Sequence, residues 1–220
     1  IEHAFLEKES AVAMPENDGI CLYSQGQGIY EDRRQVAQIL NLPVDKVRVI
    51  LVPNGGGFGG KEDLTVQGHV ALQSWLLKKP VKLTLSRPES IRMHPKRHPV
   101  WMEMKICCDK AGVLTGLKLN AVGDTGAYAS VGTKVMERVA GHATGGYQVN
   151  NIEIEAKTVY TNNIPSGAMR GFGVNQVVFA LEVLIDELCE KGGFDRWQFR
   201  YDNALVDGAK TATGQNVYGV

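Results

Sequence analysis

Apolar and polar residues in the first half of the chain follow two patterns, and both predict regular structure. Alternation with period two predicts strands, including a hairpin around the turn-forming residues 15–19. Apolar residues at helical spacing predict helices, one of which ends before Pro43. The predicted strands span residues 4–14, 20–23, 47–52 and 81–86, and the predicted helices span residues 30–40, 64–77 and 88–94.

The second half is predicted to begin with a hairpin and to end with helices. Its turn residues are Asp109–Gly112, and Gly192 and Gly193 are expected to stop the longest amphipathic helix. Residues 123–146 are rich in Gly and Ala without clear periodicity, so we expect an irregular segment there. The expected strands span residues 100–107, 113–122 and 152–160, and the expected helices span residues 177–188 and 196–205, the latter with Asp195 as N-cap.

Strands interleaved with a few helices, some hairpin-linked and some joined by crossovers, predict an α+β or α/β arrangement in two layers with mixed sheets. We expect a first region over residues 1–95, which contains a glycine loop, and a second α+β region over residues 96–220.

Composition excludes several classes of function. Lys+Arg and Asp+Glu both number 24, so no net charge favours nucleic acid. No apolar run approaches the roughly 20 residues of a membrane span. The four cysteines include no CxxC pair, and the five histidines show no metal-ligand spacing, so we expect reduced thiols in a cytoplasmic protein and no protein-ligated metal. A start at Ile1 without Met or a targeting signal suggests a piece of a longer polypeptide.

The most distinctive local feature is the run Gly55-Gly56-Gly57-Phe58-Gly59-Gly60-Lys61-Glu62, between a predicted strand and a predicted helix. Gly55, Gly60 and Lys61 fit a phosphate-binding loop, but Glu62 stands where the magnesium-binding Ser or Thr is required. A simple tight turn is a second alternative. So many glycines favour a third, a loop whose backbone N–H groups approach a flat ligand or an oxo group closely.

This run resembles a signature of the xanthine dehydrogenase and aldehyde oxidase family of molybdenum hydroxylases, and further motifs occur in that family's order over nearly the whole chain. The elements that carry the resemblance are Ser24-Gln25-Gly26-Gln27, Leu85-Ser86-Arg87-Pro88-Glu89-Ser90, Arg97-His98-Pro99, Gly123-Asp124-Thr125-Gly126-Ala127-Tyr128, Met136-Glu137-Arg138, Ala168-Met169-Arg170-Gly171-Phe172-Gly173 and Asn203-Ala204-Leu205. Bacterial xanthine dehydrogenase is the most similar member type.

The resemblance implies a molybdenum–pyranopterin (molybdopterin) cofactor, with the metal held by the pterin dithiolene and by no side chain. Gln27 matches the glutamine that hydrogen-bonds the oxo ligand, with Gln25 as a competitor; an amide N–H suits this role. The loop of Gly57, Phe58 and Gly59 matches backbone that lies against the cofactor. Arg170 matches an arginine beside the pterin, the alternative being a surface ion pair.

Substrate contacts are also implied by the resemblance. Glu62 and Arg138 match a pair that orients a purine or related N-heterocycle and stabilises developing charge, which makes them the candidate catalytic residues. A helix N-terminal carboxylate and a structural salt bridge are the respective alternatives. Phe172 matches an aromatic that packs on the substrate ring, or else belongs to the core.

Two departures limit the resemblance. Met169 stands where xanthine enzymes usually carry Phe, and no carboxylate here matches the family's catalytic glutamate. We therefore expect this piece alone to be inactive. Its expected partners are the remainder of the same polypeptide and domains or subunits with 2Fe-2S clusters and FAD, with no nucleic acid or membrane. An aldehyde oxidoreductase and a non-catalytic binding or assembly module stay open, as do a homodimeric enzyme and a cytosine-dinucleotide cofactor.

Overall fold

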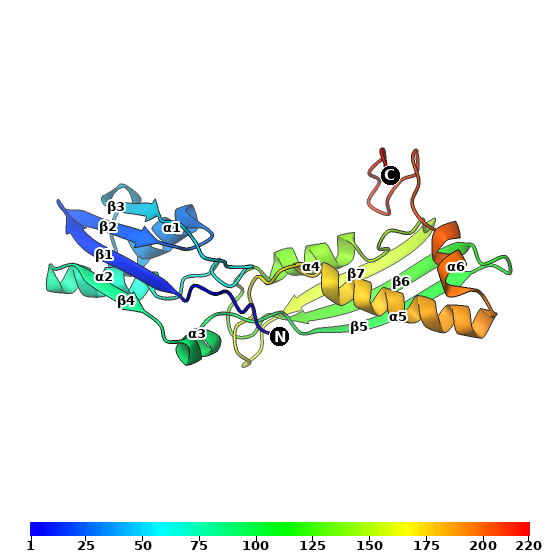
Figure 1. The fold of residues 1–220 in the computed structure, drawn as a ribbon, viewed down its shortest axis with the longest axis horizontal. Coiled ribbons are helices and arrows are strands. Elements are labelled where there is room, and N and C mark those ends of the chain that lie inside the picture. The colour runs from blue at the N-terminus through cyan, green and yellow to red at the C-terminus, as the bar shows by residue number, and fades with distance from the viewer. The chain divides into compact units, whose positions relative to one another are not determined.

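The computed structural model describes residues 1–220 and divides into two compact units. The first unit contains residues 1–97 and 167–170, and the second contains residues 98–166 and 171–220. The predicted division at residue 95 placed the Arg-Gly-Phe-Gly segment in the second region, whereas the structure assigns Arg170 to the first unit. Each unit combines a sheet with packed helices (Figure 1), which confirms the expected α+β architecture. None of the helices combines the length and the apolar composition that a transmembrane span requires.

The first unit is built on a four-stranded mixed sheet with the order β3-β2-β1-β4. Strands β1 and β2 form the predicted hairpin, and β2 pairs with β3 in parallel through the crossover helix α1. The strands are β1 Ser10–Glu16, β2 Gly19–Ser24, β3 Val47–Leu51 and β4 Val81–Thr84, and the helices are α1 Ile29–Leu40, the 3-10 helix η1 Val44–Lys46, α2 Gln67–Leu77 and α3 Arg87–Met93.

Helices α1 and α2 pack against this sheet through small and branched side chains. Val36, Val70 and Ala71 are fully buried, and Ala13 on β1 lets α2 approach the sheet closely. Helix α3 begins with a complete capping box in which Ser86 accepts from Glu89 N–H and the Glu89 carboxylate accepts from Ser86 N–H. Local patterns therefore specify most of this unit.

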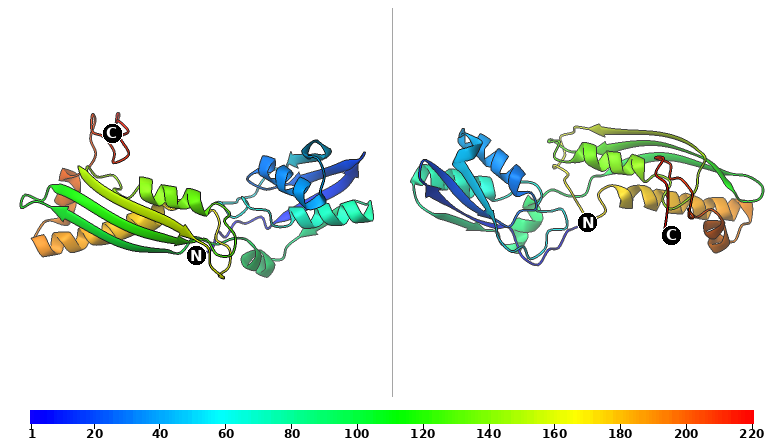
Figure 2. Two further views of the ribbon diagram at one scale, coloured as in Figure 1. Left: turned by 180° about the vertical axis from the view of Figure 1, so that it is seen from behind. Right: turned by 90° about the horizontal axis from the view of Figure 1, so that it is seen from above.

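The second unit contains a three-stranded sheet with the order β5-β6-β7. The predicted hairpin is confirmed as β5 and β6, while β7 pairs with β6 in parallel. Figure 2 shows α4 and α5 alongside one face of this sheet, and Leu119, Val139 and Leu181 meet in the core. The elements are β5 Val100–Cys108, β6 Leu114–Asp124, α4 Gly132–Gly141, β7 Asn151–Val159, α5 Val174–Gly192 and α6 Arg196–Asp202.

Two sequence predictions need correction. The first strand begins at Ser10 instead of residue 4, because residues 1–9 run without strand pairing and bury Phe5 instead. The segment 123–146 is not irregular throughout, since α4 forms within it and buries Val135, Met136 and Val139. This helix has neither a side-chain N-cap nor a long apolar repeat, so its stability comes from packing on the sheet.

Candidate functional site

The loops that follow β2 and β3 form the centre of the candidate site. These strands are parallel neighbours, with Ser24 opposite Leu51, so both loops leave the same edge of the sheet. The backbone N–H of Gln27 donates to the carbonyl of Lys61 (2.8 Å), which joins the two loops. Topology therefore brings the predicted residues Gln27, Gly57–Gly59 and Glu62 together.

Gln25 and Gln27 have different surroundings. The buried Gln25 amide donates to Lys8 O (2.8 Å) and accepts from Lys61 Nζ, so both of its ends are occupied. Gln27 is exposed, and its Oε1 accepts from the backbone N–H groups of Gly59 (3.0 Å) and Lys61 (3.2 Å). Because these two bonds fix the carbonyl end, the Gln27 amide nitrogen stays available to donate to a ligand.

Lys61 is a structural clamp inside the loop. It is 2% exposed, and its ammonium group contacts Gln25 Oε1, Glu7 Oε2 (3.2 Å) and the Phe5 ring (4.8 Å to the centroid). Burial lowers the pKa of this lysine, although Glu7 opposes the shift. A side chain enclosed in this way cannot reach a nucleotide phosphate, which argues against the phosphate-loop alternative.

Glu62 carries the free carboxylate of the loop. Its side chain is half-buried and forms no hydrogen bond or ion pair within the first unit, while its backbone N–H donates to Gly59 O (3.2 Å). Burial, followed by repulsion from Asp63, raises the pKa of the Glu62 carboxyl above its usual range. The helix N-terminal alternative is weakened because α2 begins at Gln67, five positions later. The Glu62 carboxylate is therefore available as a hydrogen-bond acceptor for a ligand, and burial favours its protonated form more than it would for an exposed glutamate.

Two Gly-Phe-Gly triplets have strained central residues. Phe58 (φ 52°) lies between Gly57 and Gly59, and Phe172 (φ 48°) lies between Gly171 and Gly173. Positive φ is uncommon for an aromatic residue and is usually maintained at functional sites. Phe58 is 46% exposed and Phe172 is half-buried, so neither ring is enclosed in a core.

Two glycines of the loop lie so close to neighbouring groups that no side chain would fit. A Cβ on Gly57 would lie 2.4 Å from Gln27 Oε1, and a Cβ on Gly59 would lie 2.6 Å from the carbonyl of Ala168. Gly59 also has a φ of +97°. Side chains at these positions would therefore displace either Gln27 or the segment 167–170.

The guanidinium groups of Arg170 and Arg138 make no ion pair within their units. Arg170 is exposed, and its backbone N–H donates to Phe58 O (2.8 Å), which ties it to the glycine loop. Arg138 is exposed on α4 of the second unit, which also contains Phe172. Within its unit, neither guanidinium forms the ion pair that the alternatives require, a surface ion pair for Arg170 and a structural salt bridge for Arg138.

Sequence reasoning assigned no role to Arg97, although it lies in a matched motif, and it missed Asp32. Arg97 Nη2 donates to Arg170 O (2.8 Å), while Nη1 is buried without a hydrogen-bond partner. Burial lowers the pKa of the Arg97 guanidinium. Asp32 is 1% exposed on α1 and accepts from Ser24 Oγ (2.7 Å), whose oxygen in turn accepts from Gly26 N–H (3.0 Å). Burial raises the pKa of Asp32 to about 6. Arg97 thus contacts the segment that contains Arg170, and Asp32 contacts the loop that contains Gln27.

The first unit suits a planar ligand with an oxo group. A fixed amide donor at Gln27, glycine backbone without Cβ atoms at Gly57 and Gly59, and the unpaired charge of Arg170 are chemically appropriate for a molybdenum–pterin group. Gln27, the glycine loop and Arg170 are the residues that would hold it.

Comparisons with known proteins agree with this fit. The family described as molybdopterin cofactor-binding domain matches residues 1–204. The chain is 44% identical over 216 residues to the nicotinate dehydrogenase large molybdopterin subunit of Eubacterium barkeri, covering 98% of this chain and 51% of that protein. It is 41% identical over 202 residues to a probable xanthine dehydrogenase subunit of Bacillus subtilis, covering 91% and 27%.

Among solved structures, the aldehyde oxidoreductase from Desulfovibrio gigas superposes with a TM-score of 0.92 at 31% identity, over 98% of this chain and 24% of that chain. The chain thus spans about half the length of the Eubacterium barkeri relative and about a quarter of the other two. The family match over nearly the whole chain, together with these relatives, shows that the protein belongs to the molybdopterin cofactor-binding domain family of the molybdenum hydroxylases.

Proposed function

We propose that the enzyme containing this chain hydroxylates an aromatic N-heterocycle, a purine or a related compound such as nicotinate, in the manner of xanthine dehydrogenase. The names of two relatives, a nicotinate dehydrogenase and a probable xanthine dehydrogenase, support this substrate class. The net reaction replaces a C–H hydrogen of the ring with a hydroxyl oxygen from water and releases two electrons and two protons. The electrons would pass to 2Fe-2S clusters and FAD on partner domains or subunits.

The observation that carries this proposal is the unpartnered, half-buried carboxyl of Glu62. Because burial raises its pKa, this carboxyl takes up a proton more readily than an exposed glutamate; it can accept from a ring N–H when ionised and donate to a bare ring nitrogen when protonated. A simple aldehyde has no ring nitrogen to use such a group. Glu62 would therefore orient the heterocycle and share a proton with it.

Arg138 and Phe172 would complete substrate recognition. An unpaired guanidinium stabilises negative charge that develops on a substrate oxygen, which lowers the barrier to attack. Phe172, with its φ of 48°, would present an aromatic face or edge to the planar ring. Met169 next to Arg170 is 9% exposed and removes no polar group relative to a phenylalanine.

Cofactor binding is assigned to Gln27, the Gly57–Gly59 loop and Arg170. When bound, the molybdenum–pterin group supplies the two-electron redox chemistry that the side chains lack. The Gln27 amide would donate to an oxo ligand without protonating it. None of the carboxylates matches the family's catalytic glutamate, so we expect turnover only in the longer protein, together with its redox partners in the cytoplasm.

The test is metal analysis and dye reduction by the full-length protein purified with its partners, with xanthine, nicotinate and an aliphatic aldehyde as separate substrates. We expect molybdenum and heterocycle turnover, and a 10²- to 10³-fold lower kcat/KM in the Glu62→Ala variant. Glu187→Ala, at an exposed position on α5, is the control and should leave turnover unchanged. Release of CMP on acid hydrolysis would identify a cytosine-dinucleotide cofactor.

An aldehyde oxidoreductase is the second candidate, because the Desulfovibrio gigas enzyme has the same fold at 31% identity. Molybdenum with turnover of the aldehyde only, unaffected by Glu62→Ala, would select it. A full-length protein without molybdenum or turnover would favour a non-catalytic assembly module.

A further inference from the structure

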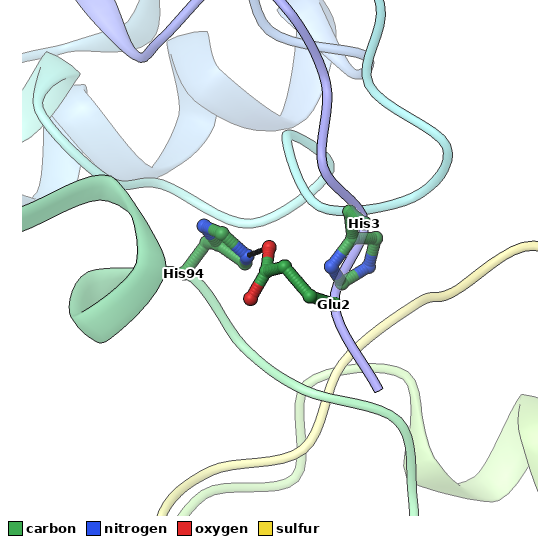
Figure 3. Close-up of side chains that lie close together, drawn as sticks. All are labelled: Glu2, His3 and His94. Carbon is green, nitrogen blue, oxygen red and sulfur yellow. Dashed lines mark hydrogen bonds and ion pairs between the residues drawn. The ribbon is translucent and has the colours of Figure 1, made fainter. Parts of the chain in front are cut away.

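Three segments of the first unit that lie far apart in sequence meet at a cluster of potential metal ligands. Glu2 and His3 come from the N-terminal segment, and His94 follows α3. One oxygen or nitrogen from each of these three residues lies within 4.8 Å of the others. Figure 3 shows the Glu2 carboxylate between the two imidazole rings, which meet edge to face with centroids 5.0 Å apart.

The surroundings of His94 determine which nitrogen can bind a cation. The ring is fully buried, and its Nδ1 lies 3.0 Å from a carboxylate oxygen of Glu9, which is 1% exposed. A buried carboxylate can only accept, so Nδ1 carries a proton that it donates to Glu9. In the neutral ring the Nε2 lone pair then points to Glu2 Oε1 at 2.6 Å. Two acceptors at this distance repel each other unless a positive group lies close to both.

His3 presents a second lone pair. Its Nε2 lies 2.8 Å from the carbonyl of Ala168, which can only accept, so this nitrogen is protonated and donates. The remaining nitrogen, Nδ1, is therefore an acceptor. It is buried without a hydrogen-bond partner in a side chain that is 6% exposed. An unsatisfied buried acceptor is costly and indicates an absent donor or cation.

Lys96 supplies positive charge to part of this cluster. Its Nζ lies 2.7 Å from Glu2 Oε2 and 2.9 Å from His94 Nε2. No hydrogen bond joins it to His3 Nδ1, which stays unsatisfied. The Lys96 side chain is 31% exposed, so its ammonium group can move into solvent if a metal cation takes its place.

We propose that Glu2, His3 Nδ1 and His94 Nε2 bind a zinc-type divalent cation in exchange for the Lys96 ammonium. Two imidazoles and one carboxylate form an established Zn²⁺ ligand set that leaves a fourth position for water. The Glu9 carboxylate and the Ala168 carbonyl act as the outer partners that orient metal-ligating histidines. All five groups belong to the first unit, and the site does not depend on the molybdenum cofactor.

The cation would fasten the N-terminal segment to the end of α3. Through the His3–Ala168 hydrogen bond it would also hold the segment 167–170, which includes Arg170. Sequence inspection could not find this set because His3 and His94 have no short spacing. The proposal therefore departs from the sequence prediction that no histidine binds a metal.

Zn²⁺ binding is measured by calorimetry on the 220-residue chain, and Co²⁺ is added as a spectroscopic probe of tetrahedral coordination. The N-terminal amine is acetylated so that it cannot act as a ligand. We expect 1:1 binding and visible Co²⁺ absorption. His3→Gln and Glu2→Gln should each weaken binding at least tenfold, while Glu9→Gln should weaken it about 10- to 100-fold. The control His142→Gln changes an exposed residue of the second unit and should have no effect.

Lys96→Met separates the proposal from its main rival, in which Lys96 is the permanent cation of the cluster. Removing the competing ammonium should strengthen Zn²⁺ binding about tenfold and preserve the Co²⁺ spectrum. No binding by either the parent chain or Lys96→Met would overturn the proposal. The same holds if binding persists undiminished in both His3→Gln and Glu2→Gln. Glu2 is partly exposed, so its variant stays informative even if a buried-site variant fails to fold.

Discussion

The two units of this protein stabilise themselves with different chemistry. The first unit buries Glu9, Asp32 and Lys61 beneath or inside the loops of the candidate site. The second unit has no buried carboxylate or ammonium; its core is an apolar cluster around Leu119, Leu181 and Ile185. The buried charged side chains therefore occur in the first unit, which contains the loops of the candidate site.

Buried polar groups give the first unit directional contacts that apolar packing cannot provide. Lys61 bonds to Gln25 and Asp32 bonds to Ser24, the two residues that directly precede Gly26 and Gln27. Such networks are strong when satisfied and costly when any member is lost. The second unit also buries a hydrogen-bonded amide, Asn203, but it buries no charged carboxylate or ammonium. Truncation of an apolar core residue there therefore removes packing without leaving a buried charge unpaired.

The largest effect is expected in the apolar unit. Leu181→Ala removes a fully buried side chain of α5 and should lower the free energy of unfolding by about 2–5 kcal/mol, because it leaves a cavity. Urea denaturation followed by circular dichroism measures this change. Val183→Ala, at a 43% exposed position on the same helix, should cost less than about 1 kcal/mol. Equal losses in the two variants would contradict the assignment of the core.

Asp32→Asn tests the buried charge of the first unit. The folded-state pKa of about 6 exceeds the ordinary value of 3.8, so the folded state binds more protons between these values. Stability contributed by Asp32 therefore falls as pH rises through this window, by up to roughly 3 kcal/mol. Relative to Asp32→Asn, the parent protein should lose this amount between about pH 4 and pH 7 in urea unfolding. The exposed Asp45→Asn control should show no such trend.

Gly59→Ala tests whether the loop needs its close approach. The new Cβ would lie 2.6 Å from the Ala168 carbonyl at a φ of +97°, so we expect about 1–3 kcal/mol of destabilisation and a lower molybdenum content in the longer protein. Gly141→Ala, at the end of α4 with open space around it, should be neutral or slightly stabilising. Metal content and urea unfolding of both variants measure the difference. If Gly59→Ala has unchanged molybdenum content and urea stability, the loop does not need a glycine at position 59.

The smallest effect is expected where the two units are alike. Ser86→Ala removes the N-cap of α3. Asp195→Ala removes the N-cap of α6, where the Asp195 carboxylate accepts from Gln198 N–H at 2.8 Å. Each change should cost about 0.5–2 kcal/mol, because capping depends on local geometry and not on the surrounding core. A much larger loss for Ser86→Ala in thermal unfolding would show that this cap also supports the loops of the first unit.

Local sequence patterns were sufficient for most helices and strands. The β1–β2 and β5–β6 hairpins, α1, and α5 with its stop at Gly193 are confirmed, since turn residues and apolar periodicity act over a few positions. Helix α4 was missed because its buried face comprises little more than Val135, Met136 and Val139 and its ends lack caps. The conformation of α4 depends on its contacts with the sheet, which cannot be predicted from the local sequence.

The candidate site shows the same limit. The glycine loop and Gln27 could be proposed from a motif, and the occupied amide of Gln25 now favours Gln27 as the ligand donor, which stays a prediction. The supporting groups could not be predicted, because Lys61 and Glu7 are 54 positions apart and Arg97 and Arg170 are 73 apart. Pairings over such distances depend on the fold.

The segment 167–170 has a consequence for synthesis on the ribosome. Its backbone bonds to Phe58, Arg97 and His3 belong to the first unit, although the rest of that unit ends at residue 97. At roughly 5–20 residues per second, the chain needs several more seconds to deliver these residues after Arg97 has emerged. During that interval the glycine loop lacks its contacts with residues 168 and 170, so the nascent first unit cannot complete its fold until this segment has left the ribosome.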